Sequence, residues 1–445
     1  MDTKAAPAMT PEGSESALLD GELDRMTAER LAARYDEVRR RTTSICAPLE
    51  TEDYVVQSMP DASPAKWHLA HTSWFFETFV LKPASAEEIG SEKYSYLFNS
   101  YYNAIGERTP RGERGLLSRP TVAEVYHYRE AIDKRMKTLL ERADPALLER
   151  LGASIVLGLN HEQQHQELIL TDLKSMFARN PLRPVYRESR GIGGAEAYPV
   201  HWLRYEEGLR RIGSEGTGFA FDNELPRHSV FVQSFQLADR LVTNQEFYAF
   251  INDGGYDQPR YWLSDGWAAR NSHGWTAPLY WERDQSDARR WRIMTLAGLR
   301  ELEPNEPVCH VSYYEADAFA RWAEARLPSE AEWEVAAEGV EVQGNFLENE
   351  QFHPQPLAAA NAEGRLGQLF GDVWEWTRSP YSPYPGYRPA PGALGEYNGK
   401  FMCNQLVLRG GSCVTPRSHI RSTYRNFFPP DARWQFSGIR LANDV

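Results

Sequence analysis

In the first half of the chain, apolar residues recur every three or four positions, which is the period of an amphipathic helix. Four such segments can be followed, and Ser63 and Pro64 stand before the second one as an expected N-cap and first helical residue. Four helices of this length are typical of an up-down bundle. The expected helices span residues 22–46, 63–82, 121–143 and 145–178.

The second half follows a different pattern, in which short apolar runs alternate with Gly, Asn, Asp and Pro. Between the halves, residues 180–199 lose the helical period and contain several Pro, Gly and Arg residues, so we place a domain boundary there. Two helical regions, at 243–253 and 314–339, interrupt the strand-like pattern, which favours an α+β domain with long loops. The expected domains are a disordered lead-in (1–20), a helical bundle (21–180) and an α+β domain (200–445).

Composition and charge narrow the classes of function. The net charge is −13 and no basic run stands out, which argues against nucleic-acid binding, because phosphates require a basic surface. The N-terminal stretch lacks the apolar core of a signal peptide, and no run of about 18 apolar residues could span a membrane. The four cysteines are scattered without a CxxC pair, as in reduced proteins. We therefore expect a soluble, cytoplasmic protein, whose oligomeric state the sequence does not reveal.

The strongest local motif is HEQQH, residues 161–165. On a helix, its two histidines lie one turn apart on the same face, together with Ile155 and Leu168. Three interpretations compete: core histidines satisfied by hydrogen bonds, a zincin-type hydrolase with Glu162 as general base, and an open metal site with a third ligand elsewhere. The metzincin extension is absent, because the motif is followed by QELILT.

The second expected helix offers that third ligand within the stretch WHLAHTSWFFETF. His71 shares the expected inward face with Trp74, whereas His68 lies nearer the edge of that face, so we favour His71. A metal ion held by His71, His161 and His165 would keep open coordination positions. Neutral imidazoles bind iron, zinc, copper and nickel, so the spacing alone does not select the metal.

These segments resemble known families. The stretch HLAHTSWFFETF followed by HEQQH is similar to the DinB-like four-helix bundle, whose metal is bound by three histidines. In the second half, VTNQEFYAFI, GDVWEWT, LRGGS and GIRLA resemble the formylglycine-generating-enzyme (sulfatase-modifying factor) fold, a variant of the C-type lectin fold. The two domains in this order resemble the sulfoxide synthases of ergothioneine biosynthesis, over about residues 25–443.

The resemblance implies an iron(II) centre on His71, His161 and His165, with O2 as co-substrate. The thiolate of cysteine and the imidazole of Nα-trimethylhistidine (hercynine) would both bind the metal, and the product would be a C–S bonded sulfoxide. A tyrosine near the iron would act as proton donor. Tyr101 and Tyr102 resemble the tyrosine pair of the branch that uses free cysteine; the alternative is that they are packing aromatics in a loop.

Further residues are implied in substrate binding. Gln164 matches a family residue that contacts the hercynine carboxylate. Arg111 and Arg114 offer planar forks to the carboxylate of the thiol substrate, unless they belong to a solvated basic loop. The segment that would receive hercynine contains Asn426, Phe427 and Phe428, whose rings suit a trimethylammonium group.

The identity of the sulfur donor depends on few residues. In the branch that uses γ-glutamylcysteine, a Trp-Asp-type pair is expected after Asn426, and here the pair is Phe-Phe. Together with the tyrosine pair, this favours free cysteine. The same chemistry with γ-glutamylcysteine, or a selenoneine synthase that uses a selenosugar, remains an alternative. An ovothiol-type enzyme would usually have a further C-terminal methyltransferase domain, which is not expected here.

Two other classes of function remain to be weighed. A true formylglycine-generating enzyme needs a pair of reactive cysteines after the RGGS segment, and here only Cys413 follows it. A noncatalytic binding module on the lectin-like fold would leave the metal motif and the helical half unexplained. Both are less consistent with the sequence than the sulfoxide synthase.

Overall fold

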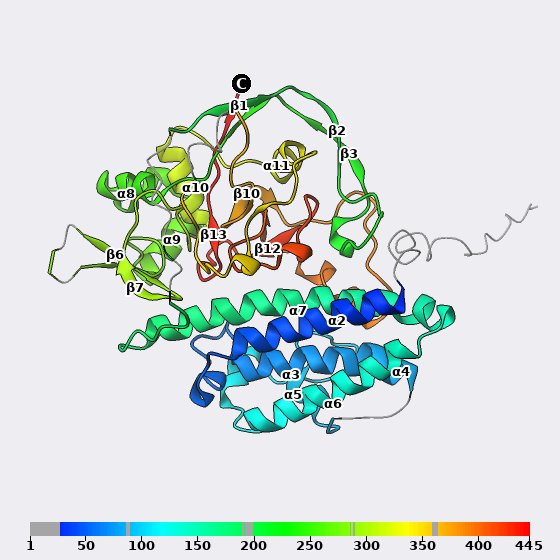
Figure 1. The fold of residues 1–445 in the computed structure, drawn as a ribbon. Coiled ribbons are helices and arrows are strands. Elements are labelled where there is room, and N and C mark those ends of the chain that lie inside the picture. The colour runs from blue at the N-terminus through cyan, green and yellow to red at the C-terminus, as the bar shows by residue number, and fades with distance from the viewer. Residues whose placement is uncertain are drawn as a thin grey trace, which may run out of the picture.

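The computed structural model describes residues 27–85, 90–188, 191, 199–284, 286–287, 290–357 and 364–445. A helical half lies against a β-rich half, and helix α7 runs along the boundary between them (Figure 1). The lead-in expected at residues 1–20 lies outside the described residues. In the described part of the chain, no helix combines the length and apolar character needed to cross a bilayer.

The N-terminal half is a four-helix bundle, as predicted. Helix α2 packs against α6 and α7, and α3 packs against the same two helices. Their apolar faces meet in a core that includes Phe76, Ile132 and Leu159. The four helices are α2 (Ala28–Cys46), α3 (Ala65–Phe76), α6 (Val122–Glu141) and α7 (Pro145–Arg179).

Capping side chains mark the beginnings of α2, α6 and α7. The side chains of Thr121 and Asp144 accept hydrogen bonds from the first turns of α6 and α7. The second helix differs from the prediction, because Pro64 has an extended backbone and is itself the N-cap residue. After α3 the chain continues through a π-helical turn, η2 (Glu77–Leu81), and the short α4 (Lys82–Ala84).

The connection from α4 to α6 carries the tyrosine and arginine candidates. It contains α5 (Tyr94–Phe98) and the 3-10 helix η3 (Arg111–Leu116). Lys66 on α3 donates to the Leu117 and Pro120 carbonyls and so holds this connection against the bundle.

The C-terminal half is an α+β domain, as predicted. Its central sheet has the order β12-β11-β10-β13, antiparallel except for the β10–β13 pair. A second sheet, β1-β4-β14, brings the last strand beside the β1–β4 pair, and β5-β6-β7 forms a third. The strands of the first two sheets are β10 (Trp374–Pro380), β11 (Leu406–Arg409), β12 (Asn426–Phe428), β13 (Ser437–Gly438), β1 (Trp202–Tyr205), β4 (Phe235–Ala238) and β14 (Ala442–Asp444). The remaining strands are β2 (Gly208–Ile212), β3 (His228–Val232), β5 (Trp281–Arg283), β6 (Trp291–Thr295), β7 (Gly298–Glu301), β8 (Gly344–Asn345) and β9 (Phe370–Gly371).

The helices of this half confirm the two predicted helical regions and add a third. Helices α8 (Asn244–Asn252), α10 (Tyr313–Trp322) and α11 (Glu330–Ala336) each begin with a Ser/Thr–Glu capping box. Helix α9 (Ser264–His273) was not predicted, because its sequence is mostly polar and contains a glycine. That glycine, Gly266, lies directly against the ring of Tyr314, so packing on α10 determines this helix.

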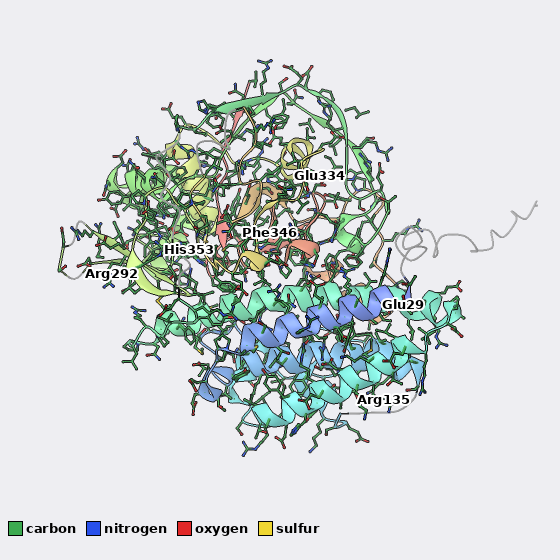
Figure 2. All side chains as sticks on the ribbon, viewed as in Figure 1. Glu29, Arg135, Arg292, Glu334, Phe346 and His353 are labelled. Carbon is green, nitrogen blue, oxygen red and sulfur yellow. The ribbon has the colours of Figure 1, made fainter. Side chains whose placement is uncertain are left out.

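Buried polar contacts join the two halves. Glu167 of α7 accepts hydrogen bonds from Trp374 Nε1 (2.6 Å), Ser412 Oγ (3.1 Å) and Thr415 Oγ1 (2.7 Å). These partners belong to the GDVWEWT and RGGS segments and their immediate continuation. Phe346 and Glu334 lie further inside the β-rich half (Figure 2). The hydrogen bonds of Glu167 hold the central sheet at a fixed position on α7.

Candidate metal centre and substrate cavity

Three buried histidines converge between α3 and α7. The Nε2 atom of His161 lies 3.1 Å from that of His71 and 3.0 Å from that of His165. Helix α7 supplies two of them because positions four apart share a face, and α3 supplies the third. Nitrogen ligands about 2.1 Å from a metal ion and at right angles to one another lie about 3.0 Å apart. The two printed spacings therefore fit nitrogen atoms that are neighbouring ligands of one metal ion.

Burial holds these imidazoles in the neutral form. It lowers the pKa of His161 to about 3, and it places the pKa values of His71 and His165 well below the ordinary range. Neutral imidazoles are the form that binds metal ions. Nδ1 of His71 lies 2.5 Å from the Phe98 carbonyl and can donate to it, which leaves Nε2 free as a ligand. The donor set therefore fits a divalent transition-metal ion, iron included.

His68, the other histidine of α3 weighed as a ligand, lies outside this triad. Its Nδ1 is 2.7 Å from Nδ1 of His165, on the side of that ring that faces away from the other ligands. Its Nε2 is 3.1 Å from Asp172 Oδ2. The structure thus groups His71, and not His68, with the two histidines of α7.

Glu162 belongs to a buried charge cluster beside α2 and α6. It accepts from Arg39 Nη1 (2.9 Å), Arg129 Nη2 (2.5 Å) and Thr42 Oγ1 (2.7 Å). Burial alone would raise the pKa of this carboxyl group, but the Arg129 and Arg39 guanidiniums outweigh it and hold the pKa at about 2. A carboxylate occupied in this way does not act as the general base of a zincin, so the hydrolase interpretation does not fit.

A cavity of about 310 Å³ opens beside the triad, between the bundle and the β-rich half. This volume is in the range of small-molecule sites. Strand β12, on the side of the β-rich half nearest the bundle, contributes one wall (Figure 1). The predicted residues that line the cavity are Tyr101, Arg111, Arg114, His161, Gln164, His165, Asn426, Phe427 and Phe428.

The two predicted arginines differ in their surroundings. Arg114 is buried, donates to Ser63 Oγ (2.9 Å) and Ser100 Oγ (3.1 Å), and lies over the Trp67 ring at 3.5 Å. Among the described residues, no carboxylate forms an ion pair with it; burial, together with Arg111, lowers its pKa to about 9. Arg111 is exposed. A buried cation that forms no direct ion pair and lies beside a cavity favours an anionic ligand.

The predicted tyrosines also differ. Tyr101 lines the cavity, whereas Tyr102 lies behind it with ring centroids 4.6 Å apart. The Tyr102 ring packs against Trp74 and Phe79, and it is fully buried. Burial raises the pKa of both hydroxyls, so each keeps its proton at neutral pH.

A third tyrosine, Tyr397, was missed by the sequence analysis. Its ring lies 5.6 Å from the ring of His161, and its hydroxyl donates to Gln164 Oε1. Burial raises its pKa as well. It lies in the irregular segment GEYNGKF, where no periodicity or motif distinguished it from other loop aromatics.

Aromatic rings form much of the cavity wall. Phe427 stacks on Tyr381 at 4.0 Å, and Phe428 meets Trp434 edge-on at 6.1 Å. Gln164 Nε2 donates to the Tyr424 hydroxyl at 2.8 Å. Such rings suit an alkylated ammonium group. The aromatic lining residues that were not predicted are Trp67, Phe221, Trp374, Tyr397, Phe401, Tyr424 and Trp434.

Comparison with known proteins matches both halves of the chain. The DinB superfamily matches residues 34–169, and the sulfatase-modifying factor enzyme 1-like domain matches residues 200–365 and 348–445. A hercynine oxygenase of Mycolicibacterium smegmatis is 33% identical, with 94% of this chain and 99% of the relative covered. One of Mycobacterium tuberculosis is 31% identical, again with 94% and 99% covered.

A formylglycine-generating enzyme of Streptomyces coelicolor is 32% identical, but it covers only 52% of this chain and 84% of the relative. The hercynine oxygenases match the bundle and the β-rich half together, whereas this enzyme matches about half of the chain. Their name indicates oxidoreductases that use oxygen. The chain therefore belongs to the hercynine oxygenase family.

Proposed function

We propose that this protein is an iron(II)- and O2-dependent sulfoxide synthase that joins the sulfur of cysteine to the imidazole ring of hercynine. The observation that carries the proposal is the set of three converging Nε2 atoms beside a cavity lined by both halves of the chain. Iron(II) at this site would bind the thiolate and supply the redox chemistry with O2. In the balanced reaction, hercynine, cysteine and O2 give hercynylcysteine sulfoxide and water.

Hercynine fits the part of the cavity between α7 and β12. Its trimethylammonium group would lie against the rings of Phe427 and Phe428, since a quaternary cation is attracted to aromatic faces. Its carboxylate would accept a hydrogen bond from the amide of Gln164. Tyr397 and Tyr424 both hydrogen-bond to this amide group and so fix its orientation before the substrate binds.

Cysteine fits the side of the cavity formed by the α4–α6 connection. The Arg114 guanidinium would bind the carboxylate of cysteine, which would give it the direct ion pair that it lacks among the described residues. Two buried arginines line the cavity, and Arg425 already pairs with Glu330 at 2.9 Å, so Arg114 is left to match the single carboxylate of free cysteine. Phe427 and Phe428 are apolar and offer no charge to a second carboxylate. γ-Glutamylcysteine carries a second carboxylate at its glutamyl end, and the described cavity lining has no second buried arginine without an ion pair to bind it, so we favour free cysteine.

Tyr101 is the member of the predicted tyrosine pair that can act on a bound substrate directly, because it lines the cavity. Its raised pKa keeps a proton on the hydroxyl, which suits a proton donor. Tyr397 holds a second protonated hydroxyl beside His161, and its hydrogen bond to Gln164 links the hercynine side of the cavity to the same cluster.

The test is a coupling assay. The protein is loaded with iron(II) without oxygen, mixed with hercynine and cysteine, and exposed to O2, and the products are identified by mass spectrometry. The expected product has the summed mass of both substrates plus one oxygen and minus two hydrogens. Parallel reactions contain γ-glutamylcysteine or a selenosugar, and His161→Ala is the negative control. If coupling occurs only with γ-glutamylcysteine or the selenosugar, that compound and not cysteine is the substrate. No coupling in any reaction would refute the proposed function.

A further inference from the structure

The three histidines of the candidate metal centre differ at the ring nitrogen that faces away from the centre. Nδ1 of His71 lies at 2.5 Å from the backbone carbonyl of Phe98. Nδ1 of His161 has no hydrogen-bond partner among the described residues. Nδ1 of His165 lies 2.7 Å from Nδ1 of His68, so this ligand alone contacts another titratable side chain at that position.

The contact continues beyond His68. Its Nε2 lies 3.1 Å from Oδ2 of Asp172, and the same carboxylate oxygen accepts from the backbone N–H of Ser63 at 2.8 Å. His68 and Asp172 are both buried. Asp172 lies two turns after His165 on α7, and His68 lies one turn before His71 on α3. The two helices that supply the metal ligands therefore also supply this series of hydrogen bonds.

Counting donors and acceptors fixes the direction of the hydrogen bonds from His165 through His68 to Asp172. If Nε2 of His165 presents its lone pair to a metal ion, the only proton of that neutral ring is on Nδ1 and is donated to His68. Nδ1 of His68 then accepts, so the proton of His68 is on Nε2 and is donated to Asp172. Asp172 accepts as a carboxylate at the end of the chain. Both ring nitrogens of His68 and of His165 have a partner in this arrangement.

We propose that His68 and Asp172 are positioning residues that fix the tautomer and ring orientation of His165 as a metal ligand. The proposal rests on the proposed three-histidine metal centre. A carboxylate at the end of such a chain strengthens the Nδ1–H hydrogen bond and makes the ligand nitrogen more basic. His165 is then the strongest donor of the three histidines, and the metal affinity depends on two residues that do not touch the metal.

Cobalt(II) binding to the full-length apoprotein tests this without turnover. His68→Leu removes both hydrogen bonds, Asp172→Asn removes only the terminal charge, and His68→Gln provides an amide that can both accept and donate. The matched control is His353→Leu, because His353 is a buried histidine whose Nε2 lies 3.2 Å from a carboxylate oxygen of Glu306. His353 lies in the β-rich half, outside the bundle (Figure 2).

The expected result is a loss of cobalt affinity of about 10–100-fold for His68→Leu and about tenfold for Asp172→Asn. His68→Gln should stay within about threefold of the wild type, and His353→Leu should bind cobalt as the wild type does. Visible absorption of bound cobalt gives the affinity, and thermal unfolding of each apoprotein checks folding. Asp172→Asn, the smaller change, tests the same chain if His68→Leu does not fold.

Wild-type cobalt affinity in both His68→Leu and Asp172→Asn would overturn the proposal, and so would an equal loss in His353→Leu. The outcome is separate from that of the coupling assay. A wild-type protein that binds cobalt but forms no sulfoxide would refute the proposed function and leave the positioning role intact. A wild-type protein that binds no cobalt would refute both.

Discussion

Arg111 and Arg114 are three positions apart and have the same chemistry, yet only Arg114 is buried against the cavity. A hydrogen bond to a charged group contributes about 1.5–3 kcal/mol. We therefore expect Arg114→Gln to raise KM for cysteine about 10–100-fold, with a smaller effect on kcat. Arg111→Gln should stay within about threefold of the wild type. Steady-state sulfoxide formation measures both, and equal increases in KM would contradict this assignment.

The tyrosine pair permits an equally direct comparison. Tyr101→Phe removes a hydroxyl at the cavity and keeps the ring packing, so it should divert the reaction from C–S coupling toward simple oxidation of the thiol. Tyr102→Phe removes a hydroxyl that does not line the cavity and should have a smaller effect. The ratio of sulfoxide to oxidised thiol is the measurement. A larger change in Tyr102→Phe would assign the proton donor to Tyr102.

How far single residues can be predicted depends on where they lie. His161 and His165 could be predicted because helical spacing places them on one face of α7, and His71 because it lies on the expected inward face of α3. Tyr397 could not, because it lies between two 3-10 helices, η9 (Ala393–Glu396) and η10 (Gly399–Phe401). Its position is determined by tertiary contacts, such as those of Glu396 with the backbone N–H groups of Asn103 and Ala104.

At the scale of elements, α7 presents different chemistry in each direction. One face carries the metal histidines and Asp172, another carries Glu167 toward the sheet, and Glu162 points to α2 and α6. The apolar period predicted this helix and its inner face. The buried partners of its polar residues could not be predicted, because they come from other helices, as Arg39 of α2 and Arg129 of α6 do for Glu162.

The Glu162 cluster makes stability depend on pH. Because the folded-state pKa of about 2 is below the usual value of 4.5, the stabilisation is complete above pH 4.5 and is lost as the pH falls toward 2. The destabilisation caused by Glu162→Gln, relative to wild type, should shrink by about 1 kcal/mol between pH 7 and pH 3.5. Urea unfolding of both proteins measures this. A difference that is independent of pH would mean that Glu162 is not ionised in the folded protein.

At the scale of the whole molecule, the cavity exists only where the two halves meet. The change of pattern at residues 180–199 predicted two domains. Their relative position could not be predicted, because the residues that join them, such as Glu167 and Lys174, have the spacing of ordinary buried positions on α7. Lys174 Nζ reaches His310 Nε2 at 2.7 Å, and His310 lies in the segment before α10.

Removing one of these contacts should weaken the coupling between the halves. Glu167→Ala removes the carboxylate that accepts from the indole of Trp374 and the hydroxyls of Ser412 and Thr415, at a cost of about 3 kcal/mol. Unfolding followed by tryptophan fluorescence and by circular dichroism should coincide in the wild type and separate in this variant. Glu149→Ala, an exposed position on α7, is the control. Coincident transitions in Glu167→Ala would contradict the expectation.

The length of α7 has a consequence for how this protein can change over time. The helix has 35 residues and is about 50 Å long, and successive residues turn by about 100°. One codon inserted between His165 and Glu167 would leave the histidine pair in place but rotate Glu167, Asp172 and Lys174 away from their partners together. Substitutions along this helix can be tested by selection one at a time, whereas a change in its length alters every contact beyond the insertion at once. Insertions and deletions should therefore accumulate in the loops of this lineage and be purged from α7.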